Sequence, residues 1–167
     1  MSKMDLTEKL KEELKKRNLW EQEDDEDDND QEENDDDQDE KDSSNHNEDF
    51  CDMVCQLLHS QTQVHIFHLG TKSYSEHKAL QGYYEGIDAL VDGIIESYQG
   101  KYGLLTNYKS YKNQSYKNKN QVLKYFTGLL NTIEEKRDCC DDSFIQNQID
   151  TVQELIYSTM YKLKFLQ

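Results

Sequence analysis

The 167-residue chain contains no proline, only one tryptophan and no long apolar run. Proline is the strongest helix breaker, so its absence leaves long helices free to continue. A helix that spans a membrane needs ~20 consecutive apolar residues, and no stretch of the sequence approaches that length. The N-terminus also lacks the apolar core of a signal peptide. These absences predict a soluble protein of the cytoplasm or another intracellular compartment, with no membrane partner.

Basic residues are scarce, and the formal net charge is −16. The distribution of charge is uneven, because residues 1–49 hold 22 of the 35 acidic residues but only 7 of the 19 lysines and arginines. Residues 50–167 are therefore nearly neutral and long enough to bury a real core. The acidity belongs to the N-terminal third alone.

That N-terminal third divides into two predicted segments. Residues 1–20 predict a short amphipathic helix, with a capping box formed by Asp5 and Glu8. Residues 21–49 consist almost wholly of polar and acidic residues, which cannot bury enough apolar surface to offset the entropy lost on ordering. We expect them to form an acidic disordered linker. The apolar positions of the short helix are Leu6, Leu10, Leu14 and Trp20.

Residues 50–167 predict an all-α domain, because apolar residues recur at spacings of three and four and no alternating strand pattern is present. A connection at 100–115 can extend about 50 Å, whereas the helices it joins are roughly 36 Å long. It can therefore run back along the fold and leave those helices parallel, as in a ferritin-like four-helix bundle with one long connection. The expected helices cover 50–69, 74–99, 116–138 and 142–165, the last capped by Asp141 or Asp142.

The second helix is expected to have two distinct faces. At about 100° per residue, its large apolar residues gather on one side, and a polar stripe lies well away from them. The stripe does not point into the bundle, so it cannot supply an internal di-iron site of the ordinary ferritin kind. The core face holds Leu80, Tyr83, Ile87, Leu90, Val91, Ile94 and Tyr98. The polar stripe holds His77, Gln81, Glu85, Asp88, Asp92 and Glu96.

Two histidines and two acids of this region form a candidate metal site. His77 and Asp92 are about 22 Å apart on a straight helix, so one ion cannot contact both. Two copies of the helix, packed antiparallel about a twofold axis, would bring His77 of one chain opposite Asp92 and Glu96 of the other. His65 can join this group because the end of the first helix adjoins the start of the second.

The same residues resemble the Dps-type mini-ferritins of the ferritin-like superfamily. HIFHLG, from His65 to Gly70, is similar to the family's His-Trp-Asn-x-x-Gly element, and His77, Asp92 and Glu96 match its remaining ligand spacings. The resemblance implies a shell of twelve subunits that oxidises ferrous iron and stores it. It also implies that His65 and His77 bind iron, or zinc or another divalent metal in its place, together with the mate's Asp92 and Glu96. Gln81 stands where the family has an acid and would be a neutral oxygen ligand.

A second interpretation keeps the Dps-like shell without efficient ferroxidase activity. The protein would then be a structural or interaction protein that presents its N-terminal helix to a partner. A third, weaker interpretation takes the acidic tract as a nucleic-acid mimic or a chaperone for basic proteins. The discriminating observations are the oligomeric mass and the iron content.

The connection itself is rich in lysine and tyrosine and contains no acid between Lys101 and Asn120. Such a strip could contact phosphates and stack on bases, but a solvated connector is the favoured interpretation. The acidic N-terminus disfavours DNA as a partner. The acidic tract could also pair with the lysines of the connection and so inhibit the binding of DNA.

The four cysteines are too few for a disulfide scaffold in a chain of this size. Cys51 and Cys55 lie one helical turn apart, and Cys139 and Cys140 are adjacent in the sequence. All four thiols could gather at one end of the bundle, where zinc or a redox disulfide is conceivable. Ordinary reduced thiols are favoured, since adjacent cysteines chelate one ion poorly. Of the other histidines, His68 is expected to pack with a hydrogen bond, and His46 and His59 to lie at the surface or in the tail.

Overall fold

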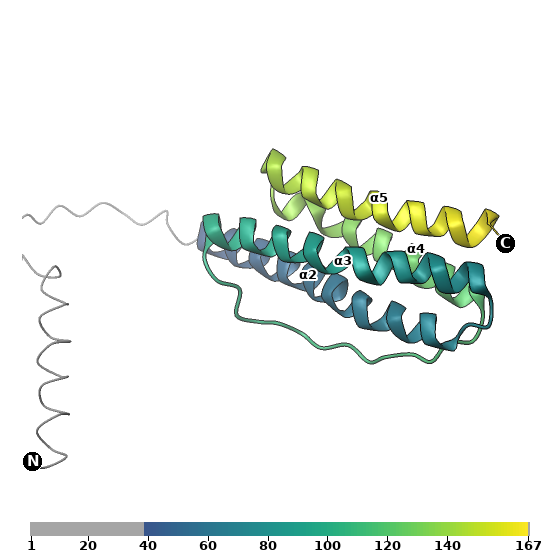
Figure 1. Cartoon of the computed structure of the whole chain (residues 1–167). Helices are drawn as coiled ribbons and strands as arrows, with labels where there is room; N and C mark the ends of the chain where they lie inside the picture. Colours follow the sequence, from purple (N-terminus) through teal and green to yellow (C-terminus); the bar gives the residue numbers. More distant parts are fainter. Residues whose placement is uncertain (1–38, 167) are drawn as a thin grey trace, which may run out of the picture. The chain divides into compact units, whose positions relative to one another are not determined.

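The structure is a computed structural model that describes residues 39–166 (Figure 1). The predicted N-terminal helix and residues 21–38 of the predicted acidic linker lie outside the described residues. Within 39–166 the chain is wholly helical, and the all-α prediction is confirmed. No helix in that range is both long and apolar enough to cross a membrane. The elements are α2 (Asp39–Gly70), α3 (Tyr74–Tyr102), α4 (Lys119–Lys136), the 3₁₀ turn η1 (Arg137–Cys139) and α5 (Ser143–Phe165).

The main difference from the predicted boundaries is at the start of α2. This helix begins at Asp39, whereas the apolar pattern predicted a start near Phe50. Residues 39–49 are almost all polar, so they carry no apolar periodicity that could reveal a helix. The last residues assigned to the acidic linker are therefore helical.

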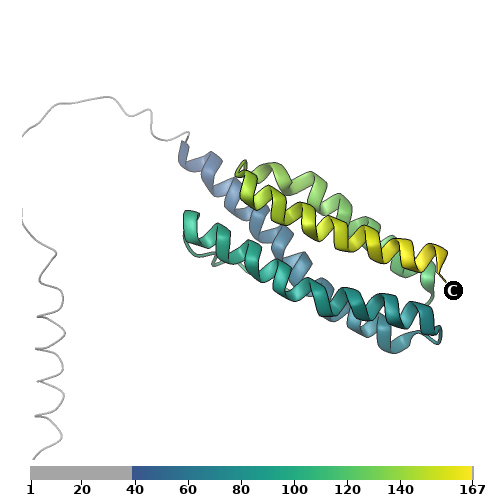
Figure 2. The ribbon, with the colours of Figure 1, turned by 45° about the horizontal axis from the view of Figure 1, so that its top comes forward.

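The path of the chain follows from one short and one long connection. Residues 71–73 reverse the chain between α2 and α3, and the Ser73 side chain caps α3 by accepting a hydrogen bond from the Glu76 amide. Residues 103–118 then run back beside α2 with no regular secondary structure, so α3 and α4 point the same way (Figures 1 and 2). At the C-terminal end of α3, Lys101 forms an ion pair with Asp142, the residue that precedes α5.

Asp142 occupies the N-cap position of α5, as predicted, but its side chain does not cap the helix. Its carboxylate instead accepts hydrogen bonds from Lys101 and from the Tyr102 hydroxyl, at 2.5 and 2.6 Å. The Lys101 ammonium, by its hydrogen bond, holds the pKa of Asp142 below its ordinary value. This acid therefore joins the end of α3 to the start of α5.

One apolar core lies among the four helices. Phe50 of α2 stacks on Tyr98 of α3, with ring centroids 3.6 Å apart, and the hydroxyl of fully buried Tyr83 is 2.8 Å from Ser60 Oγ. The core face predicted for α3 is confirmed except at Leu90, which is only partly buried. Its buried members are Leu80, Tyr83, Ile87, Val91, Ile94 and Tyr98.

Three glycines mark close approaches between segments. Gly86 and Gly93 face α5, since a Cβ atom there would come within 3.5 Å of Leu155 and 3.9 Å of Gln148. A Cβ atom on Gly70, the last residue of α2, would collide with the side chain of Tyr116 in the long connection. Glycine at the end of α2 therefore lets the connection lie directly against this helix.

Candidate functional site

Three histidines gather where α2 ends and α3 begins. His68 is buried, and its ring stacks on that of His77 with centroids 3.6 Å apart. His65 is exposed, and its ring stacks on Tyr84 of α3 at 4.2 Å. The ring centroids of His65 and His68 are 5.7 Å apart. The short 71–73 turn thus brings His77 against His68, so that both predicted histidine ligands lie near the ring of His68.

The hydrogen bonds of this pair define which ring nitrogens carry protons. His68 Nδ1 lies 2.9 Å from the backbone oxygen of His77, and His77 Nδ1 lies 3.3 Å from that of His68. A carbonyl oxygen only accepts hydrogen bonds, so each Nδ1 must donate. In a neutral imidazole the other nitrogen, Nε2, then keeps its lone pair. The expectation that His68 packs with a hydrogen bond is confirmed.

Asp92 and Glu96 lie further along α3 with both side chains exposed. Neither carboxylate has a hydrogen bond or ion pair with another described residue. The rise of the helix separates Asp92 from His77 by about 22 Å, so the chain cannot bring the four predicted ligands together by itself. Accordingly, residues 39–166 contain no group of three or more His, Cys, Asp or Glu side chains positioned to hold a metal ion.

Gln81, the fifth residue of the predicted ligand set, is engaged within its own helix. Its amide oxygen accepts a hydrogen bond from Lys78 at 2.5 Å, and its amide nitrogen donates to Glu85 at 2.7 Å. A cation at the Gln81 oxygen would have to replace the Lys78 ammonium. This arrangement disfavours metal binding at Gln81.

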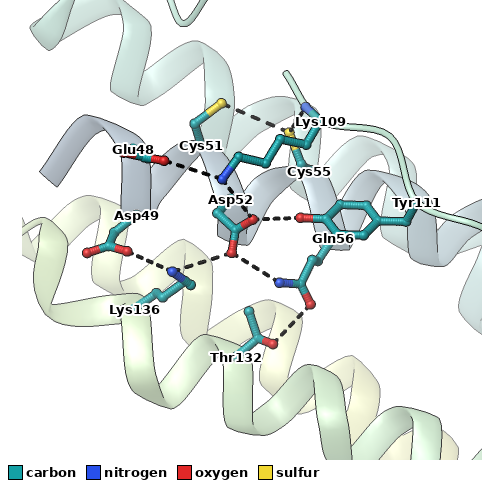
Figure 3. A network of polar contacts seen from close by, with 10 residues as sticks. All are labelled: Glu48, Asp49, Cys51, Asp52, Cys55, Gln56, Lys109, Tyr111, Thr132 and Lys136. Carbon is teal, nitrogen blue, oxygen red and sulfur yellow. Dashed lines mark hydrogen bonds and ion pairs between the residues drawn. The ribbon is translucent and has the colours of Figure 1, made fainter. Parts of the chain in front are cut away.

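A second polar cluster, centred on Asp52, was not predicted from the sequence (Figure 3). The Asp52 carboxylate accepts hydrogen bonds from Tyr111 at 2.6 Å, from Gln56 at 3.2 Å and from Lys109 at 3.4 Å. Lys136 of α4 bridges it to Asp49, with nitrogen–oxygen distances of 3.3 and 2.7 Å. We call these residues the Asp52 network. It fastens the long connection and α4 to the same turns of α2.

Two opposing effects act on the pKa of Asp52. Burial alone would raise it, but the hydrogen bonds from Tyr111, Lys136 and Lys109 outweigh burial and hold it below its ordinary value. The carboxylate is therefore charged at neutral pH and balanced by two ammonium groups. The network therefore joins segments of the fold, and the Asp52 carboxylate keeps no free position for a metal or another ligand.

The rest of the connection is fastened to α2 in the same manner. The fully buried Gln63 donates to the Gln114 carbonyl at 2.8 Å and accepts from the Gln114 amide at 2.6 Å. His59, only half-buried, pairs with Asn113 at 2.9 Å. Because these partners are about fifty residues apart, no local sequence pattern could reveal them. The only signal was the unusual length of the connection without secondary structure.

The four cysteines are free thiols in the structure. Cys51 and Cys55 approach to 4.0 Å between sulfur atoms, and the Lys109 amide donates to Cys55. Burial, with a further contribution from Cys55, raises the pKa of Cys51 to about 11. Burial, with Cys140 beside it, raises that of Cys139 to about 12. These two thiols stay protonated near neutral pH and are poor nucleophiles and poor metal ligands.

These features define residues 39–166 as an all-helical region whose long connection is fastened to α2. The chain belongs to the family of unknown function DUF5856, whose model matches residues 68–163. The match begins at the buried His68 and includes His77, Asp92 and Glu96, whereas His65 precedes it. No curated protein and no solved structure matches the chain.

Proposed function

We propose that this protein is a ferritin-like subunit of the Dps type that binds and oxidises ferrous iron between two copies of the chain. Two imidazoles and two carboxylates suit a divalent first-row metal such as iron. His65 and His77 of one chain would bind the ferrous ion with Asp92 and Glu96 of its mate. Each ferrous ion would give one electron to peroxide or oxygen, and the ferric product would be stored inside an oligomeric shell.

The observation that supports this proposal best is the hydrogen bond from His77 Nδ1 to the His68 carbonyl. Histidines that bind metals commonly donate their other ring nitrogen to a backbone oxygen, which fixes the ring and its tautomer. With Nδ1 as the donor, a neutral His77 would offer Nε2 as a ligand. In this proposal the α2–α3 turn would orient His77 before any metal binds.

The other half of the site must come from a second molecule. Asp92 and Glu96 are exposed and lack partners among the described residues, which favours a role at an interface over one in the core. An antiparallel pair of α3 helices would complete two identical sites at once. The parallel α3 and α4 and the long connection agree with a ferritin-like bundle.

A second candidate function is a shell protein that keeps this assembly without efficient ferroxidase activity. The contact of Lys78 with the Gln81 oxygen favours it, because Gln81 stands where the Dps-type family has an acidic ligand and its oxygen already accepts from an ammonium group. A positive charge beside the site would weaken the binding of ferrous iron. In this case the particle would assemble without metal, and its N-terminal segment would bind a partner.

Iron oxidation and particle mass, measured together, test the proposal. We expect the full-length protein to form particles larger than a dimer and to convert ferrous iron to a ferric product with peroxide as oxidant. Asp92→Ala combined with Glu96→Ala should lower the rate at least tenfold and leave the helical content unchanged.

A matched control removes two acids from another surface. Glu134 and Glu135 are exposed on α4 and form no ion pair with a described residue, so Glu134→Ala with Glu135→Ala changes the charge equally. This control should oxidise iron at the rate of the natural protein. Equal rates in all three proteins would refute the metal site, whereas a large particle without iron oxidation would favour the second candidate.

A further inference from the structure

A groove of about 780 Å³ lies between the long connection, α2 and α4. A cavity of this size can accept a ligand as large as a nucleotide. The groove shares no residue with the proposed iron site. Its composition is unusual for such an acidic protein, since three lysines line it and no aspartate or glutamate does.

The three lysines of the groove differ from their neighbours in having no counter-ion among the described residues. Lys112, Lys117 and Lys124 form no ion pair with any residue in the described part of the chain. By contrast, Lys109 and Lys136, on the same side of the molecule, are neutralised by the acids of the Asp52 network. Within the part of the chain that the structure describes, the groove therefore carries about three positive charges that no acidic residue pairs with.

The outer wall of the groove is held in place before any ligand arrives. Tyr111 is fixed by Asp52, and the backbone of Gln114 is fixed by the buried Gln63. The Lys117 amide donates to the side chain of Gln121, at the start of α4. A wall that is already ordered loses little further entropy on binding, which favours a specific site over a loose charged surface.

Neutral groups complete the lining. The side chains of Gln56, Gln121 and Thr132 offer polar atoms beside the lysines. Tyr125 also lines the groove, and its hydroxyl is covered and lacks a hydrogen-bond partner among the described residues. Gly128 leaves open space, because nothing lies within 4 Å of where its Cβ would be. The lining thus combines cations and neutral polar groups around one hollow.

We propose that this groove binds a small anion with several phosphate groups, either an inorganic oligophosphate or the phosphate chain of a nucleotide. Three ammonium groups distributed along a hollow match several linked phosphates better than a single orthophosphate. Lysine binds phosphate as a point charge, so it imposes little requirement on the rest of the ligand. The observations on the groove that support this assignment do not depend on the proposed iron site or on oligomerisation.

Titration calorimetry of the full-length protein with tripolyphosphate, ATP and orthophosphate tests this assignment. We expect one saturable site per chain for tripolyphosphate, with orthophosphate binding at least tenfold more weakly and affinity falling as salt rises. Equal affinities for tripolyphosphate and ATP would identify the phosphate chain as the recognised part. A higher affinity for ATP would add a contact with the nucleoside.

Two variants separate the groove from general surface charge. Lys112→Gln, Lys117→Gln and Lys124→Gln together should weaken tripolyphosphate binding at least tenfold. The same number of charges removed from exposed sites elsewhere, by Lys72→Gln, Lys78→Gln and Lys164→Gln, should change it less than threefold. Gly128→Leu should block binding without changing any charge, and it replaces a poor helix former in α4 with a good one.

Three results would overturn the proposal. The first is no saturable binding of tripolyphosphate by a folded protein. The second is an equal loss of affinity in the two lysine variants, which would indicate nonspecific attraction. The third is tight binding of a single-stranded oligonucleotide without binding of tripolyphosphate, which would assign the groove to nucleic acid.

Discussion

The rings of His68 and His77 stack 3.6 Å apart, and each donates a hydrogen bond to the other's backbone carbonyl. One ring is buried and the other half-buried, so the pair reaches from the core to the proposed site. The stack and the hydrogen bonds hold the His77 ring against His68. Replacing His68 or His77 should therefore have a different effect from replacing His65, which is exposed.

Replacing His68 should destabilise the fold more than replacing His65. His68→Ala removes a buried ring and its hydrogen bond, and we expect a loss of about 2–3 kcal/mol in the free energy of unfolding. His65→Ala removes an exposed ring and should change stability by about 0.5 kcal/mol or less. Urea denaturation followed by circular dichroism measures both values. Similar losses for the two variants would contradict this division of roles.

The Asp52 network should make stability fall in acid. The pKa of Asp52 is lower in the folded than in the unfolded chain, so its contribution is present above the ordinary value near 3.8. That contribution is lost as the pH falls through the lower folded pKa. Asp52→Asn should cost about 1–3 kcal/mol at pH 7, and the gap to the natural protein should narrow in acid.

Chemical denaturation at pH 7, pH 4 and below checks this expectation. Asp88→Asn serves as the control, because Asp88 is exposed on α3 and has no hydrogen bond or ion pair with a described residue. Its stability should follow that of the natural protein at each pH. A gap for Asp52→Asn that stays constant as the pH falls would show that the carboxylate's charge does not matter.

Apolar periodicity predicted the helices and the core face of α3 well, because burial of these side chains depends on local spacing. It could not locate the start of α2, where polar residues continue the helix as far back as Asp39. The contacts of Asp52 with Tyr111 and Lys136 were equally out of reach, since they join three distant segments. The predicted metal ligands are a different case, because the proposed site would take residues from two molecules. One chain therefore holds only half of it.

Gly70 should be intolerant of any side chain. A methyl group there would collide with Tyr116, whose hydroxyl is itself held by a hydrogen bond to Glu76, so this side chain cannot move aside freely. We expect Gly70→Ala to destabilise the protein by about 1–3 kcal/mol. Gly100→Ala is the matched control, because it adds the same methyl group to open space in α3. It should be neutral or stabilising by up to about 1 kcal/mol, and thermal melts compare the two.

A mixing experiment tests whether the proposed iron site is shared between chains. One variant lacks the histidines, through His65→Ala and His77→Ala, and the other lacks the acids, through Asp92→Ala and Glu96→Ala. Each alone should fail to oxidise iron. In a mixed pair related by a twofold axis, one site loses all four ligands and the other regains all four.

Refolding the two variants together in equal amounts should therefore restore about a quarter of the natural number of sites, since about half of the pairs are mixed and each mixed pair has one intact site. Refolding them separately before mixing, without subunit exchange, provides the control and should restore none. A site built within one chain would gain nothing from co-refolding, because neither variant holds a complete ligand set. Recovery in the co-refolded sample alone is thus the result that requires ligands from two molecules.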